Sequence, residues 1–95
     1  MYYIYILVNK SNDRIYVGHT YDLRKRIWEH KNHANPNSFT ARYNITKLVY
    51  FESGEYYYET RVREKQIKGY YRREKKYALV EIDNPYFREL YYDLF

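Results

Sequence analysis

The sequence predicts an α+β fold, in which helices flank a small three-stranded, largely antiparallel sheet in the order β-β-α-β-α-α-α. Runs of aromatic and β-branched residues at 2–8, 14–17 and 48–51 are typical of short strands. Polar turn-forming residues at 9–13 separate the first two runs and predict a hairpin. Apolar residues recur at helical spacing after residue 20 and again after residue 54, which indicates helices packed on one sheet.

The first helix follows the hairpin directly. We expect Thr20 to cap its N-terminus and Asp22 to lie in its first turn, where a negative charge suits the helix dipole. Leu23 and Ile27 would form the stripe that faces the sheet. Residues 32–38 contain proline, asparagine and serine and are predicted to form a loop.

Three helices are predicted after the third strand. The first covers 55–68 and would end at Gly69, and the second covers 71–82. A short final helix would begin at Pro85, with Asn84 as its N-terminal cap. No linker divides the chain, so residues 1–95 are expected to form one domain.

Composition excludes several classes of protein. The absence of cysteine excludes disulfide frameworks and thiolate metal sites. No apolar run approaches the roughly 18 residues of a membrane span, and no signal-peptide pattern follows Met1. We therefore expect a cytoplasmic protein that does not enter a membrane.

Positive charge indicates a polyanionic partner. The chain has 17 Lys and Arg residues against 12 acids, a formal net charge of +5, which favours nucleic acid. The alternative is a basic surface that binds nothing. Seven basic residues in the second half of the chain are candidates to contact the phosphate backbone, unless they only keep a pair of helices solvated: Arg61, Lys65, Lys68, Arg72, Arg73, Lys75 and Lys76.

Short motifs occur along the chain in a fixed order. Tyr3-Ile4-Tyr5 is followed by Tyr16-Val17-Gly18, then by Arg26 and, one helical turn later, by His30. This set resembles the GIY-YIG nuclease family, in particular its small stand-alone bacterial members and the N-terminal nuclease domain of the bacterial excinuclease. Two late segments extend the resemblance: Arg63-Glu64-Lys65-Gln66-Ile67-Lys68-Gly69 and Asp83-Asn84-Pro85.

The resemblance implies hydrolysis of DNA phosphodiester bonds with one divalent metal, Mg²⁺ or Mn²⁺, held by Glu64. Helical spacing from Thr60 and Ile67 predicts that Glu64 faces the sheet and is partly buried. A buried carboxylate needs a cation nearby. That cation is either the metal or a partner in a salt bridge, for which Arg26 or a lysine is the candidate.

Four further residues are candidate catalytic groups by the resemblance. Tyr5 would act as general base or position the attacking water, but a phenol with a pKa of about 10 needs a nearby cation to become basic enough. Tyr16 would hydrogen-bond to the phosphate or to Tyr5, and His30 would aid proton transfer or bind phosphate. Arg26 would grip the phosphate with its planar guanidinium. The alternatives are that Tyr5 and Tyr16 only pack in the core and that Arg26 is a solvated charge on its helix.

Three residues are expected to support the site. Gly18 would let backbone and substrate approach closely, or would only make the strand-to-helix turn. His19 is a candidate phosphate contact, and Asn84 supports the site, caps a helix, or does both. Tyr3 stands where the family motif has glycine. We expect strand alternation to point its ring away from the face that holds Tyr5.

The predicted function is that of a metal-dependent endonuclease acting on duplex or branched DNA, in repair or recombination, as a monomer directed by an unidentified targeting protein. The first alternative is a non-catalytic nucleic-acid-binding module that keeps the same fold. The second is an interaction protein whose many tyrosines pack against a partner.

Overall fold

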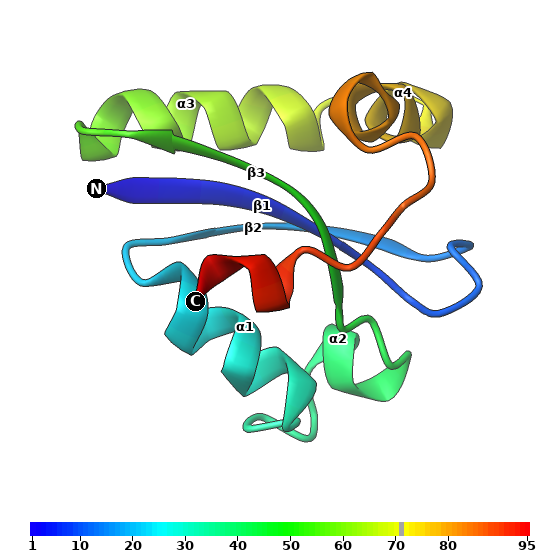
Figure 1. Cartoon of the computed structure of the whole chain (residues 1–95). Coiled ribbons are helices and arrows are strands. Elements are labelled where there is room, and N and C mark those ends of the chain that lie inside the picture. The colour runs from blue at the N-terminus through cyan, green and yellow to red at the C-terminus, as the bar shows by residue number, and fades with distance from the viewer. Residues whose placement is uncertain (71) are drawn as a thin grey trace.

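Three antiparallel strands form the centre of the molecule. The computed structural model describes residues 1–70 and 72–95 (Figure 1). Its strands are β1 (Tyr2–Val8), β2 (Ile15–Thr20) and β3 (Lys47–Gly54), in the spatial order β2-β1-β3. The predicted hairpin of β1 and β2 is confirmed, and β1 is the central strand because β3 pairs with its other edge.

Helices cover both faces of the sheet, which confirms the predicted α+β class. One layer contains α3 (Tyr57–Lys68) and α4 (Arg73–Asp83); the other contains α1 (Leu23–Lys31), the short α2 (Phe39–Arg42) and a 3₁₀ helix (Tyr91–Leu94) (Figure 1). Within the described parts of the chain, no helix has the length and apolarity that crossing a membrane requires.

The alternation of side chains along β1 divides the core in two. Ile4, Ile6 and Val8 pack toward α3 and α4, and Tyr5 and Leu7 pack toward α1. Because residues two apart on a strand share a face, the expectation that Tyr3 and Tyr5 point to opposite faces was wrong. Tyr3 packs at the margin of the same cluster as Tyr5.

The N-terminal cap of α1 is Asp22, so the prediction of Thr20 was wrong. An Asp22 side-chain oxygen accepts a hydrogen bond from the Lys25 amide at 3.2 Å. Since the helix begins at Leu23, Thr20 lies too far upstream to cap it. Its hydroxyl instead accepts a bond from the Asp22 amide at 3.1 Å and fixes the turn that leads into the helix.

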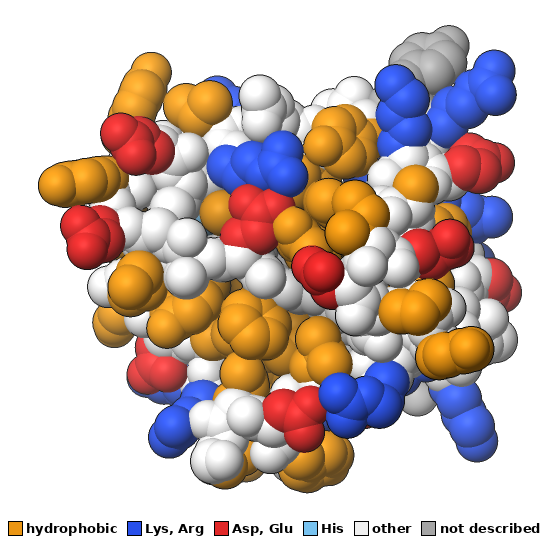
Figure 2. Space-filling model, turned by 45° about the horizontal axis from the view of Figure 1, so that its top comes forward, with side chains coloured by type: hydrophobic (Ala, Val, Ile, Leu, Met, Phe, Trp, Pro, Cys, Tyr) orange, Lys and Arg blue, Asp and Glu red, His pale blue; other side chains and the backbone are white. Residues whose placement is uncertain are grey.

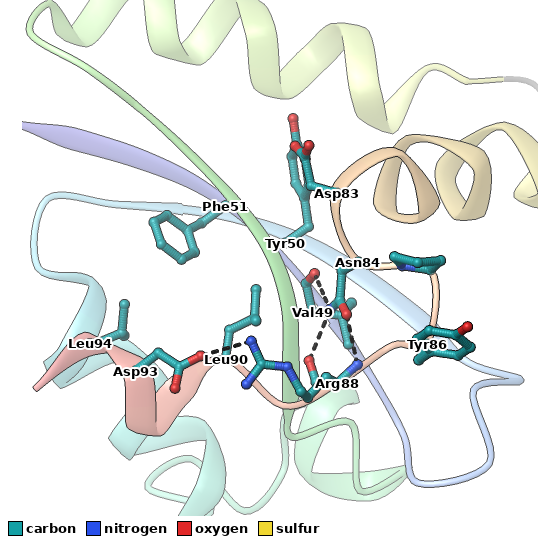
Figure 3. Close-up of a pocket in the computed structure, with 11 residues that line it drawn as sticks. Val49, Tyr50, Phe51, Asp83, Asn84, Tyr86, Arg88, Leu90, Asp93 and Leu94 are labelled. Carbon is teal, nitrogen blue, oxygen red and sulfur yellow. Dashed lines mark hydrogen bonds and ion pairs between the residues drawn. The ribbon is translucent and has the colours of Figure 1, made fainter.

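The predicted final helix after Pro85 is absent from the structure. Asn84 follows the last turn of α4, and its buried side chain bonds the carbonyls of Val49 and Arg88 and accepts from the Arg88 amide (Figure 3). Through these bonds the amide holds an irregular segment against β3. The helical turn that ends the chain begins only at Tyr91.

Two boundaries and one helix also differ from prediction. Helix α3 begins at Tyr57, two residues later than expected, and α4 begins at Arg73. The predicted start of α4 at residue 71 lies outside the described residues. Helix α2 arises inside a segment that contained no long helical pattern, where Ser38 caps a single turn.

Candidate active site

Four candidate catalytic side chains meet on the α1 face of the sheet. The Tyr5 hydroxyl lies 2.9 Å from Nε2 of His30. The Tyr16 ring packs beside both, with ring centroids 6.2 Å from that of Tyr5 and 5.6 Å from that of His30. Arg26 lies one helical turn before His30, and its charge acts on the pKa of Tyr5. The structure thus brings together Tyr5, Tyr16, Arg26 and His30.

Gly18 makes room for this group. Tyr5 and Gly18 are partners in the β1–β2 ladder. A Cβ atom on Gly18 would lie 2.2 Å from Cζ of Tyr5 and 2.3 Å from its hydroxyl oxygen, distances at which atoms overlap. The Tyr5 ring therefore occupies the space that any other residue at position 18 would fill. Gly18 supports the site by admitting this ring.

Thr40 is the second partner of His30 and was not among the predicted site residues. The Thr40 hydroxyl lies 3.0 Å from Nδ1 of His30 and 3.2 Å from the hydroxyl of Ser38, and Thr40 is buried in α2. With both ring nitrogens engaged, the imidazole has a fixed orientation between Tyr5 and α2. Ser38 could have been recognised as a helix cap, but the single helical turn that follows it is too short to show a periodic pattern.

Burial keeps the Tyr5–His30 pair uncharged. Desolvation, reinforced by the charge of Arg26, lowers the pKa of His30 to about 4. Desolvation also raises the pKa of Tyr5 above its ordinary value, with Tyr16 adding to the rise and Arg26 opposing it. The cation that we expected near Tyr5 is present, yet it does not overcome burial. At neutral pH the pair is a phenol hydrogen-bonded to a neutral imidazole.

Arg26 forms an ion pair with Glu29 and remains partly exposed. Its Nη1 lies 3.2 Å from a carboxylate oxygen of Glu29, and its side chain remains 40% exposed. The guanidinium thus faces solvent beside the Tyr5–His30 pair. This placement leaves N–H groups available for an anion at the surface.

Glu64 is buried on the opposite face of the sheet, on the side of α3. It is only 3% exposed, which confirms the predicted burial. Arg61 Nη1 lies 2.8 Å from Oε1, and Lys68 Nζ lies 2.6 Å from Oε2. Its partners are these two residues of its own helix, so the proposed bridge to Arg26 is absent. Oε1 accepts no hydrogen bond, although it is buried and forms an ion pair with Arg61.

His19 belongs to the group around Glu64. Its Nε2 lies 2.8 Å from the Thr60 hydroxyl, and the charge of Glu64 partly offsets the burial that lowers the pKa of His19. Adjacent residues of β2, Gly18 and His19, therefore border the two groups on opposite faces of this edge strand. Among the described residues, no hydrogen bond or ion pair joins Glu64 to Tyr5, Tyr16 or Arg26.

The predicted basic residues are mostly exposed along α3 and α4. Figure 2 shows Lys and Arg side chains gathered at the α3–α4 corner. Lys76 is half-buried, and Arg73 donates a hydrogen bond of 2.6 Å to the carbonyl of Asp13. The residues that lie open to an external partner are Arg61, Lys65, Lys68, Arg72 and Lys75.

Asn84 lies apart from both groups. It lines a pocket between β3, the end of α4 and the C-terminal segment (Figure 3). No other predicted catalytic or supporting residue lines this pocket. Its hydrogen bonds to Val49 and Arg88 connect segments of the fold.

Comparison with known proteins identifies the family. The model of the GIY-YIG catalytic domain matches residues 1–78.

The chain belongs to the GIY-YIG family. A UPF0213 protein of Haloquadratum walsbyi is 36% identical over 80 residues, which cover 84% of this chain and 86% of that protein. No solved structure is a significant match. The resemblance noted in the motifs is thus confirmed, and with it membership of a nuclease family whose substrates are nucleic acids. The GIY-YIG match includes Tyr5 and Glu64 and ends before Asn84.

GIY-YIG nucleases generally depend on a divalent metal, and the residues around Glu64 fit one kind of site. The described residues contain no cluster of three or more His, Cys, Asp or Glu side chains that could enclose an ion. Mg²⁺ is commonly held by one or two carboxylates while it keeps several waters and takes phosphate oxygens as ligands. In such a site the ligand would be Oε1 of Glu64, which is buried, accepts no hydrogen bond and lies 2.8 Å from Nη1 of Arg61.

Proposed function

We propose that this protein is an endonuclease that hydrolyses phosphodiester bonds of DNA with one divalent metal, Mg²⁺ or Mn²⁺, at Glu64. The observation that carries the proposal is the 2.9 Å contact between the Tyr5 hydroxyl and His30, buried beside Arg26 in a member of a nuclease family. Such an enzyme would serve DNA repair or recombination.

In this proposal Tyr5 and His30 act as a pair. The neutral imidazole accepts the phenol proton at Nε2 while the Tyr5 oxygen takes a proton from the attacking water. Neither group has to be charged before the reaction, in agreement with the burial of the pair, but the same burial opposes the charge that His30 gains in the transfer. The Thr40 hydroxyl at Nδ1 holds the ring in line for this transfer.

Arg26 and Tyr16 would stabilise the charge that develops on the phosphate. The half-exposed guanidinium presents N–H groups at the surface beside Tyr5, and hydrogen bonds from arginine to phosphate are strong because both partners are charged. A bound divalent ion would supply Lewis-acid stabilisation of the phosphate and of the leaving oxygen. Glu64 would hold the ion, and Arg61 and Lys68 would then give up part of their ion pairs with this carboxylate.

A plasmid-nicking assay with Mg²⁺ or Mn²⁺ tests this function. We expect the parent protein to convert supercoiled DNA to the nicked form. Tyr5→Phe and Glu64→Ala should each lower the rate by about a hundredfold or more, since each removes a group that acts in the transition state. Tyr21→Phe is the matched control, because Tyr21 is 75% exposed and is assigned no role in catalysis. Nicking at the parent rate by both active-site variants would exclude the mechanism.

One observation favours a second candidate, a non-catalytic nucleic-acid-binding module. Arg61 and Lys68 already neutralise Glu64, as expected for a structural carboxylate. This module would bind DNA with a steep dependence on salt and would cleave under no metal. The two candidates separate when binding and nicking are measured on the same protein with Mg²⁺, with Mn²⁺ and with EDTA.

A further inference from the structure

Three aromatic rings form a triangular group, the aromatic cluster, where the edge strand β2 meets α3. The ring centroids of Tyr2, His19 and Tyr57 lie 5.4 to 5.8 Å from one another, and the planes are inclined by only 19° to 34°. The bond from His19 to Thr60 fixes one corner of the aromatic cluster. The three rings therefore have a fixed mutual arrangement, with moderate tilts, before any partner arrives.

The hydrophobic core does not account for this arrangement. Tyr57 is 49% exposed, whereas Tyr5 in the core is 1% exposed. An aromatic ring that its neighbours orient, and that still faces solvent, offers a flat surface to another flat ring. Nucleobases bind to such surfaces irrespective of sequence, because every base has a π face.

Basic residues beside the aromatic cluster could contact the phosphates of a nucleic-acid strand. Tyr57, Arg61, Glu64 and Lys68 lie at spacings of four, three and four residues and so share one face of α3. The Arg61 guanidinium carbon lies over the Tyr57 ring, 5.9 Å from its centroid. Seven residues of helix rise by about 10 Å, so Tyr57 lies within a few nucleotides of Glu64 along a bound strand.

We propose that Tyr57, supported by Tyr2 and His19, stacks against an unpaired base of the DNA strand that approaches Glu64. Inside a duplex each base is already stacked on its neighbours, so its faces are closed to the protein. The site therefore selects DNA that has unpaired nucleotides near the bond to be cut, with Arg61 on a neighbouring phosphate. The position of the cut rests on the proposed function, whereas base binding does not.

The test measures binding without cleavage. In EDTA, the fluorescence anisotropy of a labelled single strand and of the matching duplex gives both affinities, and 2-aminopurine in the single strand reports stacking through its quenching. We expect Tyr57→Ala to weaken single-strand binding by about tenfold, to reduce the quenching, and to leave duplex binding unchanged. Tyr57→Phe should bind as the parent does.

Two further variants test whether the loss of binding is specific to the aromatic ring of Tyr57. Tyr57→Leu keeps an apolar side chain at the start of α3 and removes the aromatic face, so it should reproduce the loss seen for alanine. Tyr58→Ala alters the next residue, which is 80% exposed and outside the aromatic cluster, and it should leave both binding affinities unchanged. Equal losses for Tyr57→Ala and Tyr58→Ala, or equal losses on single strand and duplex, overturn the proposal.

The result is independent of catalysis. If no metal supports nicking and Tyr57→Ala still weakens only single-strand binding, the proposed endonuclease fails and the stacking site stands. If nicking proceeds and Tyr57→Ala binds the single strand as tightly as the parent does, the endonuclease stands and the stacking site fails.

Discussion

Gly18 illustrates how a single missing Cβ shapes the candidate site. In an ordinary strand, alanine in place of glycine is neutral or mildly stabilising. Here the new Cβ would overlap the Tyr5 ring at 2.2 Å. We expect Gly18→Ala to lower the free energy of unfolding by about 1–3 kcal/mol and to abolish nicking, as measured by urea denaturation and the plasmid assay.

A double-substitution cycle isolates the cause. In a Tyr5→Ala background the ring is gone, so Gly18→Ala should cost little further stability. If the cost of Gly18→Ala is the same with and without the Tyr5 ring, then the backbone, and not the contact with Tyr5, requires glycine at position 18.

His30 should make stability depend on pH. Its pKa is about 4 in the folded state and about 6.5 in an unfolded chain. Between these values the unfolded state binds more protons, so the His30 contribution to stability is complete above pH 6.5 and is lost as the pH falls toward 4. The free energy of unfolding, measured from pH 7 to 4, should therefore decline less steeply in His30→Gln. His33→Gln, at an exposed position, controls for the substitution itself.

At this scale the motifs predicted that Tyr5, Tyr16, Arg26 and His30 are neighbours, and they are. Glu64, which was expected to join them, lies on the other face of the sheet, and the residue that orients His30 was not predicted. Spacing along β1, β2 and α1 determines which side chains share a face, and this made Tyr5, Tyr16, Arg26 and His30 predictable as neighbours. Thr40 contacts His30 only after the chain has turned back through 32–38. The periodic patterns of strands and helices do not predict this contact between Thr40 and His30.

The C-terminal segment depends on one amide at the end of α4. Asn84 makes three hydrogen bonds, to the carbonyls of Val49 and Arg88 and from the Arg88 amide. Asn84→Ala leaves these groups without their partner, and we expect a loss of about 2–3 kcal/mol in urea denaturation. Asn32→Ala is the control, because Asn32 is exposed and its single side-chain bond goes to Trp28 of its own helix.

An equal loss in both variants would show that Asn84 does no more than an ordinary helix-terminal asparagine. The same residue explains why the end of the chain was predicted incorrectly. Asn followed by Pro is a strong sign of a helix start, but tertiary bonds to β3 engage the side chain first. The hairpin and α3 were predictable because alternation and helical spacing persist over many residues there. Helix α2 was not, because it has four residues.

At the scale of the whole molecule, β2 separates two chemical groups. Tyr5, Tyr16, Arg26 and His30 lie toward α1, and Glu64 lies toward α3, with Gly18 and His19 as consecutive residues between them. The proposed mechanism needs both groups at one phosphate of the DNA strand, so that phosphate would have to bind at this edge, beside Gly18 and His19. The exposed basic residues of α3 and α4 lie on the Glu64 side, so they would hold the strand on that face.

This arrangement predicts a localised dependence of binding on salt. Each phosphate contact that is lost should reduce the slope of log K against log salt by about 0.9 for duplex DNA. Replacing Lys65, Arg72 and Lys75 by glutamine should therefore flatten the slope by almost three and weaken binding to all sequences alike. Anisotropy titrations between low and moderate salt, in EDTA, provide the measurement.

The matched control replaces three exposed basic residues that lie elsewhere: Lys10 in the hairpin turn, Lys25 on α1 and Arg42 on α2. Both triple variants lower the net charge of +5 by the same three units, so a partner that senses only total charge would respond equally to them. Contact along α3 and α4 requires that the first variant lose more of the slope. Equal slopes would show that DNA does not run along these two helices. The sheet edge at β2 would then be the remaining feature that positions the strand.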